Sequence, residues 1–263
     1  MSLLEAAGRV ARRPGRQIQA FGVGSAKSGT HSIAALFGRS FRGHHEPACK
    51  PMIRAILARS EGTMSDAQVM RMLLRRDRRL RLEMDSSQLN APFLDLLPTL
   101  FPESKFIFTI RDCASYLTSV IDHQLTRGKS SQTWRAMRQW RFGGFAYSRH
   151  EHILRRLDLY PIAGYLAYWA RHNRSVLEHV PADRLLVVRT DQITASIPRM
   201  AEFLGIPADS LDAGHSHAYR ATRRYGIVEQ LDPQFVSDCM HQHCEPIMRQ
   251  FFPEIRHYMF RAE

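Results

Sequence analysis

Lysine is scarce in this chain. Only 4 of the 37 basic residues are lysine, at positions 27, 50, 105 and 129, and the other 33 are arginine. Against 25 acidic residues this gives a formal net charge of +12. Coding bias explains most of the arginine, but an excess of this size still predicts an anionic partner, such as a nucleic acid, a membrane surface or a phosphorylated ligand. The scarcity also makes each lysine conspicuous.

Cysteine is rare as well, with four residues in 263, which excludes a disulfide framework. Two of the four stand in the segment Cys239-Met-His-Gln-His-Cys244, which has the composition of a metal-binding cluster. The segment has a helical pattern, so its side chains point in several directions and do not converge on one tetrahedral ion. We therefore expect a packed terminal helix there and no metal site.

Long apolar runs are missing too. No stretch approaches the roughly 20 apolar residues that span a bilayer. Segment 1–16 carries its arginines after its apolar residues, the wrong order for a secretory signal. We expect a flexible basic lead over residues 1–16, no integral membrane segment and a cytoplasmic location.

Short apolar runs alternate with longer amphipathic segments, which predicts an α/β fold with a parallel sheet. No linker divides the chain, so we expect a single domain over residues 17–263. Ser65, Asp112 and Asp232 are good residue types for helix N-caps. Residues 128–160 are rich in aromatics and arginine and predict an irregular or helical excursion from the sheet. The predicted strands are 17–23, 41–45, 80–84, 105–110 and 184–188, and the predicted helices are 30–37, 52–59, 66–76, 93–100, 114–127, 160–179, 193–204 and 233–252.

A loop rich in small residues follows the first predicted strand, with the sequence Phe21-Gly-Val-Gly-Ser-Ala-Lys-Ser-Gly-Thr-His31. Small residues let successive backbone N–H groups turn toward one anion, the next helix adds its dipole, and Lys27 adds a point charge. This pattern predicts a phosphate-binding loop, and a glycine-rich connection that binds nothing is the alternative. It is not a Walker A motif, because Lys27 precedes Gly29 instead of following it, which disfavours a nucleotide kinase.

The segment Ala26-Lys-Ser-Gly-Thr-His-Ser32 resembles the 5′-phosphosulfate-binding loop of sulfotransferases that use 3′-phosphoadenosine 5′-phosphosulfate (PAPS). Residues 105–119 resemble the 3′-phosphate-binding segment of that family, in which a strand ends in arginine and a serine follows eight positions later. Arg111 and Ser119 keep that spacing. Segments 101–107 and 184–207 give weaker likenesses. By this resemblance the donor-binding residues are Ser25, Ala26, Lys27, Ser28, Gly29, Thr30, His31, Arg111 and Ser119.

The resemblance implies a three-layer P-loop-like α/β fold with a central parallel sheet and helical additions. It also implies PAPS as co-substrate, adenosine 3′,5′-bisphosphate as product and no metal, closer to the bacterial and carbohydrate-acting branch than to the cytosolic small-molecule branch. Two departures stand out. His31 and Ile33 replace the usual threonine and tryptophan, and the R-K-G-x-x-G-x-W segment is absent. In its place residues 220–226 offer Arg223 or Arg224 for the 3′-phosphate, with a solvated basic loop as the alternative.

The acceptor must lose a proton during transfer, which requires a histidine or carboxylate nearby. Glu46 at the end of the second predicted strand is our choice, by analogy with the bacterial and carbohydrate-acting branch. His45 and His44 are rivals, because the cytosolic branch uses histidine, and a polar strand end without function is the alternative. Glu83 and Asp85 end the next predicted strand, and either could position the acceptor or pair with Lys27, although a structural cap is the preferred interpretation of each.

The sequence thus predicts sulfuryl transfer from PAPS to a hydroxyl, or less readily an amine, of a small-molecule, glycan or lipid acceptor. Six aromatic residues could line the acceptor pocket or belong to the core: Trp134, Trp140, Phe142, Tyr147, Tyr165 and Trp169. Two other functions are weighed against it, a nucleotide kinase on the same fold and a basic nucleic-acid-binding protein. No nucleic-acid-binding motif supports the latter. The sequence identifies neither the acceptor nor the oligomeric state.

Overall fold

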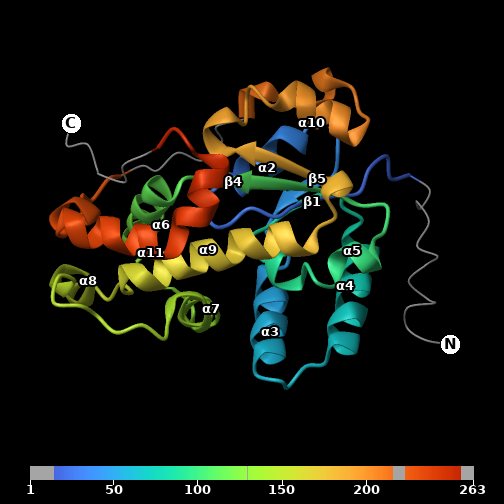
Figure 1. The fold of residues 1–263 in the computed structure, drawn as a ribbon. Helices are drawn as coiled ribbons and strands as arrows, with labels where there is room; N and C mark the ends of the chain where they lie inside the picture. Colours follow the sequence, from blue (N-terminus) through green and yellow to red (C-terminus); the bar gives the residue numbers. More distant parts are fainter. Residues whose placement is uncertain (1–14, 129, 216–222, 256–263) are drawn as a thin grey trace. The chain divides into compact units, whose positions relative to one another are not determined.

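The computed structural model describes residues 15–128, 130–215 and 223–255 (Figure 1). The chain forms two compact units. Unit 1 takes the described residues of 1–110 and 175–219, and unit 2 takes those of 111–174 and 220–263. The single domain expected over residues 17–263 stays a prediction.

Unit 1 is built on a five-stranded sheet in the order β2-β3-β1-β4-β5, and all four strand pairings are parallel. This confirms the predicted α/β class with a central parallel sheet. The longest pairing runs between β4 and β5, from Phe106 opposite Leu185 to Ile110 opposite Arg189. The strands are β1 Ala20–Gly22, β2 Gly43–His45, β3 Met84–Ser86, β4 Lys105–Ile110 and β5 Leu185–Arg189.

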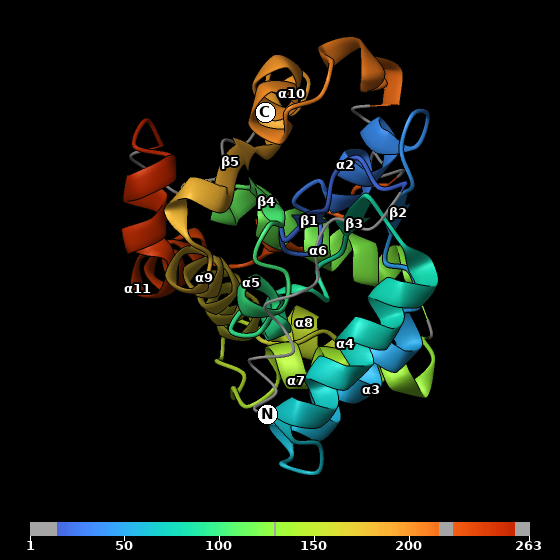
Figure 2. The ribbon, with the colours of Figure 1, turned by 90° about the vertical axis from the view of Figure 1, so that its right-hand side faces the viewer.

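The helices of unit 1 cover the sheet with their apolar faces. Helix α2 packs against β2 and β3, and α3 lies beside α4 (Figures 1 and 2). Ser65 caps α4 in a capping box with Gln68, as its residue type predicts. A buried apolar cluster joins α2 to α10, and it includes Ile33, Phe37 and Met200. The bounds are α2 Thr30–Phe37, α3 Cys49–Ser60, α4 Asp66–Leu80, α5 Leu97–Leu100 and α10 Ile197–Leu204, with short 3₁₀ turns at Ala91–Phe93, Ala182–Arg184, Thr190–Gln192, Ala208–Ser210 and Ala213–His215.

Two predicted elements of unit 1 differ from the structure. Residues 80–84 were expected as a strand, but α4 continues to Leu80 and β3 begins only at Met84. Arg81 ends the helix in a left-handed conformation with φ 48°, and its N–H bonds Asp77. The helix expected over 93–100 is instead a 3₁₀ turn followed by the single-turn α5, which has Pro98 in its first turn.

Unit 2 is helical and has an aromatic core. Phe142, Tyr165 and Trp169 are buried, and the ring centroids of Phe142 and Tyr165 lie 4.6 Å apart. Asp112 and Asp232 cap α6 and α11 as predicted, accepting from the backbone N–H of Ser115 and Phe235. The helices are α6 Cys113–Arg127, α7 Gln132–Phe142, α8 His152–Arg156, α9 Ile162–His179, of which residues up to Arg174 belong to this unit, and α11 Pro233–Phe251, with a 3₁₀ turn at Val228–Gln230.

The sequence predicts neither a membrane-spanning segment nor a metal site, and both features can be sought in the residues that the structure describes. None of the helices resolved in them has the length and apolar character that crossing a bilayer requires. They also contain no cluster of three or more His, Cys, Asp or Glu side chains able to hold a metal ion. Cys239 and Cys244 lie in α11 as buried free thiols, in the terminal helix that the sequence predicts.

Candidate active site

The loop predicted to bind phosphate connects β1 to α2. The backbone N–H of Val23 still donates to Ile107 on β4, so the chain leaves the sheet only at Gly24. It then turns tightly, because both the N–H and the hydroxyl of Ser28 donate to the carbonyl of Ser25, at 3.2 and 2.8 Å. Ser25, Ser28 and Thr30 are buried, whereas Ala26 and Lys27 are half-buried at the bend.

Two backbone positions in this loop are left-handed, Lys27 with φ 66° and Gly29 with φ 103°. Gly29 is the N-cap of α2 and has no side chain to cap it, so the first N–H groups of the helix remain available to an anion. A non-glycine residue in this conformation costs about 1 kcal/mol or more, so Lys27 is held there against its own preference. Such strain is typical of ligand-binding loops.

Neighbouring strands hold the loop in place. The hydroxyl of Thr190, just after β5, is shared between the carbonyls of Ser28 and Ile110, at 2.6 and 3.0 Å. The Ser28 hydroxyl also lies 3.2 Å from that of Thr109 on β4. A Cβ atom at Gly24 would come within 2.0 Å of the Thr109 hydroxyl oxygen, so only glycine fits there. The loop is therefore fastened to the carboxyl ends of β4 and β5, where parallel sheets bind their ligands.

The end of β2 lies against the start of α2. Nε2 of His45 is 3.2 Å from the Thr30 hydroxyl and 3.9 Å from a carboxylate oxygen of Glu46. The rings of His45 and His31 lie 4.9 Å apart. Burial lowers the pKa of His45, opposed by the Glu46 charge and reinforced by that of His31. His45 therefore stays neutral at neutral pH and can accept a proton.

Glu46 is also held in a defined position. Its backbone is left-handed with φ 49°, its N–H donates to Ser86 at 3.1 Å, and Gln88 donates its side-chain amide to the carboxylate. By contrast, His44 is exposed on the opposite face of the strand, because successive side chains alternate. The structure thus brings Glu46 and His45 to the predicted loop and leaves His44 out.

The predicted 3′-phosphate residues lie in unit 2. Arg111 follows β4 directly, and its Nε donates to the hydroxyl of Ser115 at 2.9 Å. Ser115 and Ser119 are four residues apart on α6, so both lie on the same face of that helix. Burial lowers the pKa of Arg111, Asp112 opposes this, and the charge of Arg224 adds to it.

The sequence leaves open whether Arg223 or Arg224 binds the 3′-phosphate, and the charge effect of Arg224 on Arg111 favours Arg224. The guanidinium of Arg224 lies close enough to Arg111 for the charges to interact, whereas Arg223 places its guanidinium 4.9 Å from the ring of Tyr225. Two like charges held together form a site that an anion would stabilise. Arg220, Ala221 and Thr222 of the same segment lie outside the described residues.

The comparisons with known proteins agree with this geometry. A family model described as "Sulfotransferase domain" matches residues 19–215, well over half of the chain. The chain belongs to the sulfotransferase domain family. It is thus a sulfotransferase, as the residues of its loop predict, and not the nucleotide kinase weighed against it. No curated protein sequence matches the chain.

Solved structures of sulfotransferases resemble this sulfotransferase at low sequence identity. The enzyme from Alicyclobacillus acidocaldarius is 15% identical, with a TM-score of 0.51 over 91% of this chain and 98% of that chain, which shows a shared fold. The sulfotransferase domain of the Synechococcus PCC 7002 olefin synthase is 16% identical, with a TM-score of 0.44 over 86% and 84% of the two chains. Mouse sulfotransferase SULT7A1, solved in complex with PAP, is 17% identical, with a TM-score of 0.38 over 100% and 92%.

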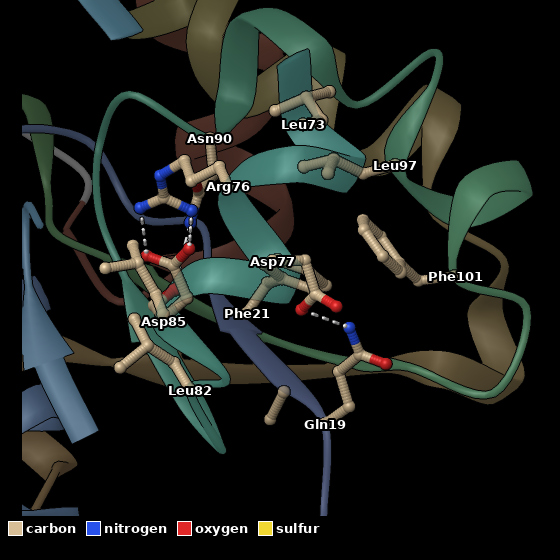
Figure 3. A pocket seen from close by; sticks show the side chains of 12 residues that line it. Gln19, Phe21, Leu73, Arg76, Asp77, Leu82, Asp85, Asn90, Leu97 and Phe101 are labelled. Carbon is tan, nitrogen blue, oxygen red and sulfur yellow. Dashed lines mark hydrogen bonds and ion pairs between the residues drawn. The ribbon is translucent and has the colours of Figure 1, made fainter. Parts of the chain in front are cut away.

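Glu83 and Asp85 have structural partners in this sulfotransferase, in keeping with the structural role preferred for them. Asp85 forms a buried ion pair with Arg76 of α4, as Figure 3 shows. Glu83 precedes β3 and accepts from the backbone N–H groups of Gln17 and Arg42, at 2.8 and 3.1 Å. A small cavity beside Asp85 has a volume of about 10 Å³, close to one water molecule, and cannot hold an acceptor.

The six aromatics suggested for the acceptor pocket fall into two groups. Phe142, Tyr165 and Trp169 belong to the core of unit 2, and Trp169 donates its indole N–H to the carbonyl of Arg111 at 3.0 Å. Tyr147 is exposed, and Trp134 and Trp140 are half-buried. Sequence reasoning missed Ser86, Gln88, Thr109 and Thr190 around the loop and β2, and Ser115 beside Arg111 in unit 2. Only Ser115 carried a signal, its four-residue spacing from Arg111 and Ser119.

Proposed function

We propose that this sulfotransferase transfers a sulfuryl group from PAPS to a hydroxyl group of its acceptor, or less readily an amine, and leaves adenosine 3′,5′-bisphosphate. The observation that carries the proposal is the contact between Thr30 and His45. It joins the loop suited to the phosphosulfate to the strand end that holds both candidate bases. A donor anion and a proton acceptor are thereby brought within reach of one reaction centre.

The loop supplies what a transferring sulfuryl group requires. The open N–H groups at the start of α2 and the ammonium of Lys27 stabilise negative charge on the 5′-phosphate as the bond to sulfur breaks. Ser25, Ser28 and Thr30 keep the loop compact, and Ala26, Gly29 and His31 complete the residues assigned to the phosphosulfate. Because the loop is already strained and tied to Thr190, it needs little reorganisation on binding.

The 3′-phosphate is assigned to Arg111, Ser119 and Arg224, with Arg223 as the weaker choice. A phosphate would relieve the repulsion between Arg111 and Arg224 and accept charge-assisted hydrogen bonds from both. Ser115 acts as a positioning residue, because its hydroxyl bonds Arg111 Nε.

Glu46 is assigned as the general base, with His45 as its rival. Both are within reach of the Thr30 end of the loop, and Gln88 fixes the carboxylate. With Glu46 as base, the acceptor hydroxyl passes its proton to the carboxylate as its oxygen bonds to sulfur, and Gln88 holds that carboxylate in place.

Thermal-shift measurements test the donor assignment. Adenosine 3′,5′-bisphosphate should raise Tm more than ATP with magnesium or a DNA duplex at equal concentration, because a ligand stabilises the folded state in proportion to its binding. Lys27→Ala should abolish transfer from PAPS. A larger shift with ATP and magnesium, or near-normal turnover by Lys27→Ala, would contradict the proposal.

The base is tested by a pair of substitutions. Glu46→Gln should lower kcat by about a hundredfold or more, since general bases contribute roughly 10²–10⁴. His45→Asn should lower it less. If Glu46→Gln retains its rate while His45→Asn loses it, the base is His45. Exposed His44 provides the control, and His44→Asn should behave as the wild type.

A further inference from the structure

Unit 2 contains a buried arginine for which the transfer reaction has no use. Arg141 lies one residue before the end of α7 and is only 4% exposed. A guanidinium is always charged, and an unpaired charge is costly to remove from water. Such a residue therefore calls for a partner.

The protein leaves one edge of this guanidinium without a hydrogen-bond acceptor. The Nε and Nη2 atoms of Arg141 are both buried and both lack a partner. These two N–H groups point the same way along one edge of the planar group. They form the fork that binds the two oxygens of a carboxylate side by side.

Aromatic rings surround the fork. The Arg141 guanidinium carbon is 5.4 Å from the centre of the Tyr168 ring and 6.0 Å from that of Trp134. The hydroxyl of Tyr116 is likewise buried without a partner. The charge of Arg141 is among the groups that lower the pKa of Tyr116 against the larger effect of burial, so the phenol and the guanidinium are close. The three open donors therefore lie near one another.

No acid within the described residues pairs with Arg141. The two buried carboxylates of unit 2 are engaged elsewhere. Glu151 accepts from the backbone N–H groups of Ser148 and Ile162, both at 2.7 Å, and Asp122 accepts from that of Tyr225 at 3.1 Å. Water could satisfy the open N–H groups, but it would leave the charge uncompensated.

We propose that unit 2 holds a binding site for the carboxylate group of a small organic ligand, with Arg141 as its charge partner and Tyr116 as a further hydrogen-bond donor. The planar fork matches the two oxygens of one carboxylate, and Arg171, whose guanidinium carbon is 5.7 Å from the Tyr168 ring, adds a second positive charge nearby. The planar rings of Trp134 and Tyr168 suit a flat, largely apolar body such as an aromatic carboxylate. The site goes beyond the proposed transfer and does not depend on it.

Thermal-shift measurements with benzoate as the probe test this site. Benzoate at about ten times its Kd should raise Tm by roughly 3 °C, as mass action predicts for a chain of this size. Uncharged benzamide should give no shift. Arg141→Met should abolish the benzoate shift, and the control Arg135→Met, an exposed arginine of the same helix, should keep it.

Two further variants keep the test decisive. Tyr116→Phe removes only an unpartnered hydroxyl, so it should fold normally and weaken benzoate binding several-fold. Lys27→Ala should leave the benzoate shift unchanged, because the site is separate from the phosphosulfate loop. The proposal is overturned if benzoate gives no shift, if inorganic sulfate binds through Arg141 while benzoate does not, or if the shift survives in both Arg141→Met and Tyr116→Phe.

Discussion

The hydroxyl of Thr30 and Nε2 of His45 lie 3.2 Å apart, and this contact joins the first residue of α2 to the last residue of β2. The residues are 15 positions apart and come from two different predicted motifs, the phosphate-binding loop and the strand end with the candidate bases. Their contact makes one site of two segments. It also makes Thr30 a residue whose substitution reports on both.

Replacing Thr30 by valine should lower kcat about fivefold, because a lost hydrogen bond of roughly 1 kcal/mol leaves the His45 ring free to turn. Thr30→Ser keeps the hydroxyl and should retain most of the activity. Steady-state kinetics of both variants with PAPS checks this. Equal rates for the valine and serine variants would show that the hydroxyl does not position His45.

The lowered pKa of His45 predicts how stability depends on pH. Burial, as the largest cause, puts the folded-state pKa below the ordinary value of 6.5. As pH falls below about 6.5 the unfolded chain takes up this proton before the folded protein does, so the contribution of His45 to stability is lost on acidification and is complete above that pH. The difference in Tm between pH 7.5 and 5.5, two working values around the ordinary pKa, should therefore be smaller in His45→Asn than in the wild type. His44→Asn, which removes an exposed imidazole from the same strand, is the matched control variant.

Lys27 combines an assigned catalytic role with a strained backbone, and one substitution separates the two. Lys27→Gly removes the charge and relieves the left-handed strain, so it should be as stable as the wild type or more stable by up to about 1 kcal/mol, yet inactive. Lys27→Ala keeps the strain and should gain no stability. Urea unfolding of both variants, together with their turnover, tests this. A glycine variant less stable than the alanine variant would contradict the strain.

The buried pair of Arg76 and Asp85 should be important for stability and not for chemistry. The two side chains are 10% and 6% exposed, so Asp85→Asn leaves a buried charge unpaired and should cost about 3 kcal/mol of unfolding free energy. The pair of Arg59 and Asp95, whose side chains are 22% and 38% exposed, offers the more accessible control, and Asp95→Asn should cost less than about 1 kcal/mol. Turnover of Asp85→Asn well below its Tm should stay close to that of the wild type. A large loss of kcat with unchanged stability would give Asp85 the role in the acceptor site that the structure does not support.

Much of the fold was predictable because the relevant signals are local. The bounds of α2 and β4 match the prediction, and Ser65, Asp112 and Asp232 cap their helices as their residue types indicate. The start of β3 was misplaced because Arg78 and Arg79 continue a polar helix that hydrophobic alternation does not reveal. The structural role preferred for Asp85 is confirmed, but its partner Arg76 was not predicted, because it belongs to that same helix.

The sequence by itself determined the loop around Lys27, the spacing of Arg111 and Ser119, and the parallel sheet, because short-range geometry and residue type are enough to define them. Tertiary structure alone decided that His45 and not His44 faces the loop, that Gln88 holds Glu46, and that Arg223 lies against the ring of Tyr225. It alone also left the fork of Arg141 buried and open. These outcomes depend on which distant segments pack together. The energies of such contacts depend on burial and on distances in space, and neither can be read from the order of the residues.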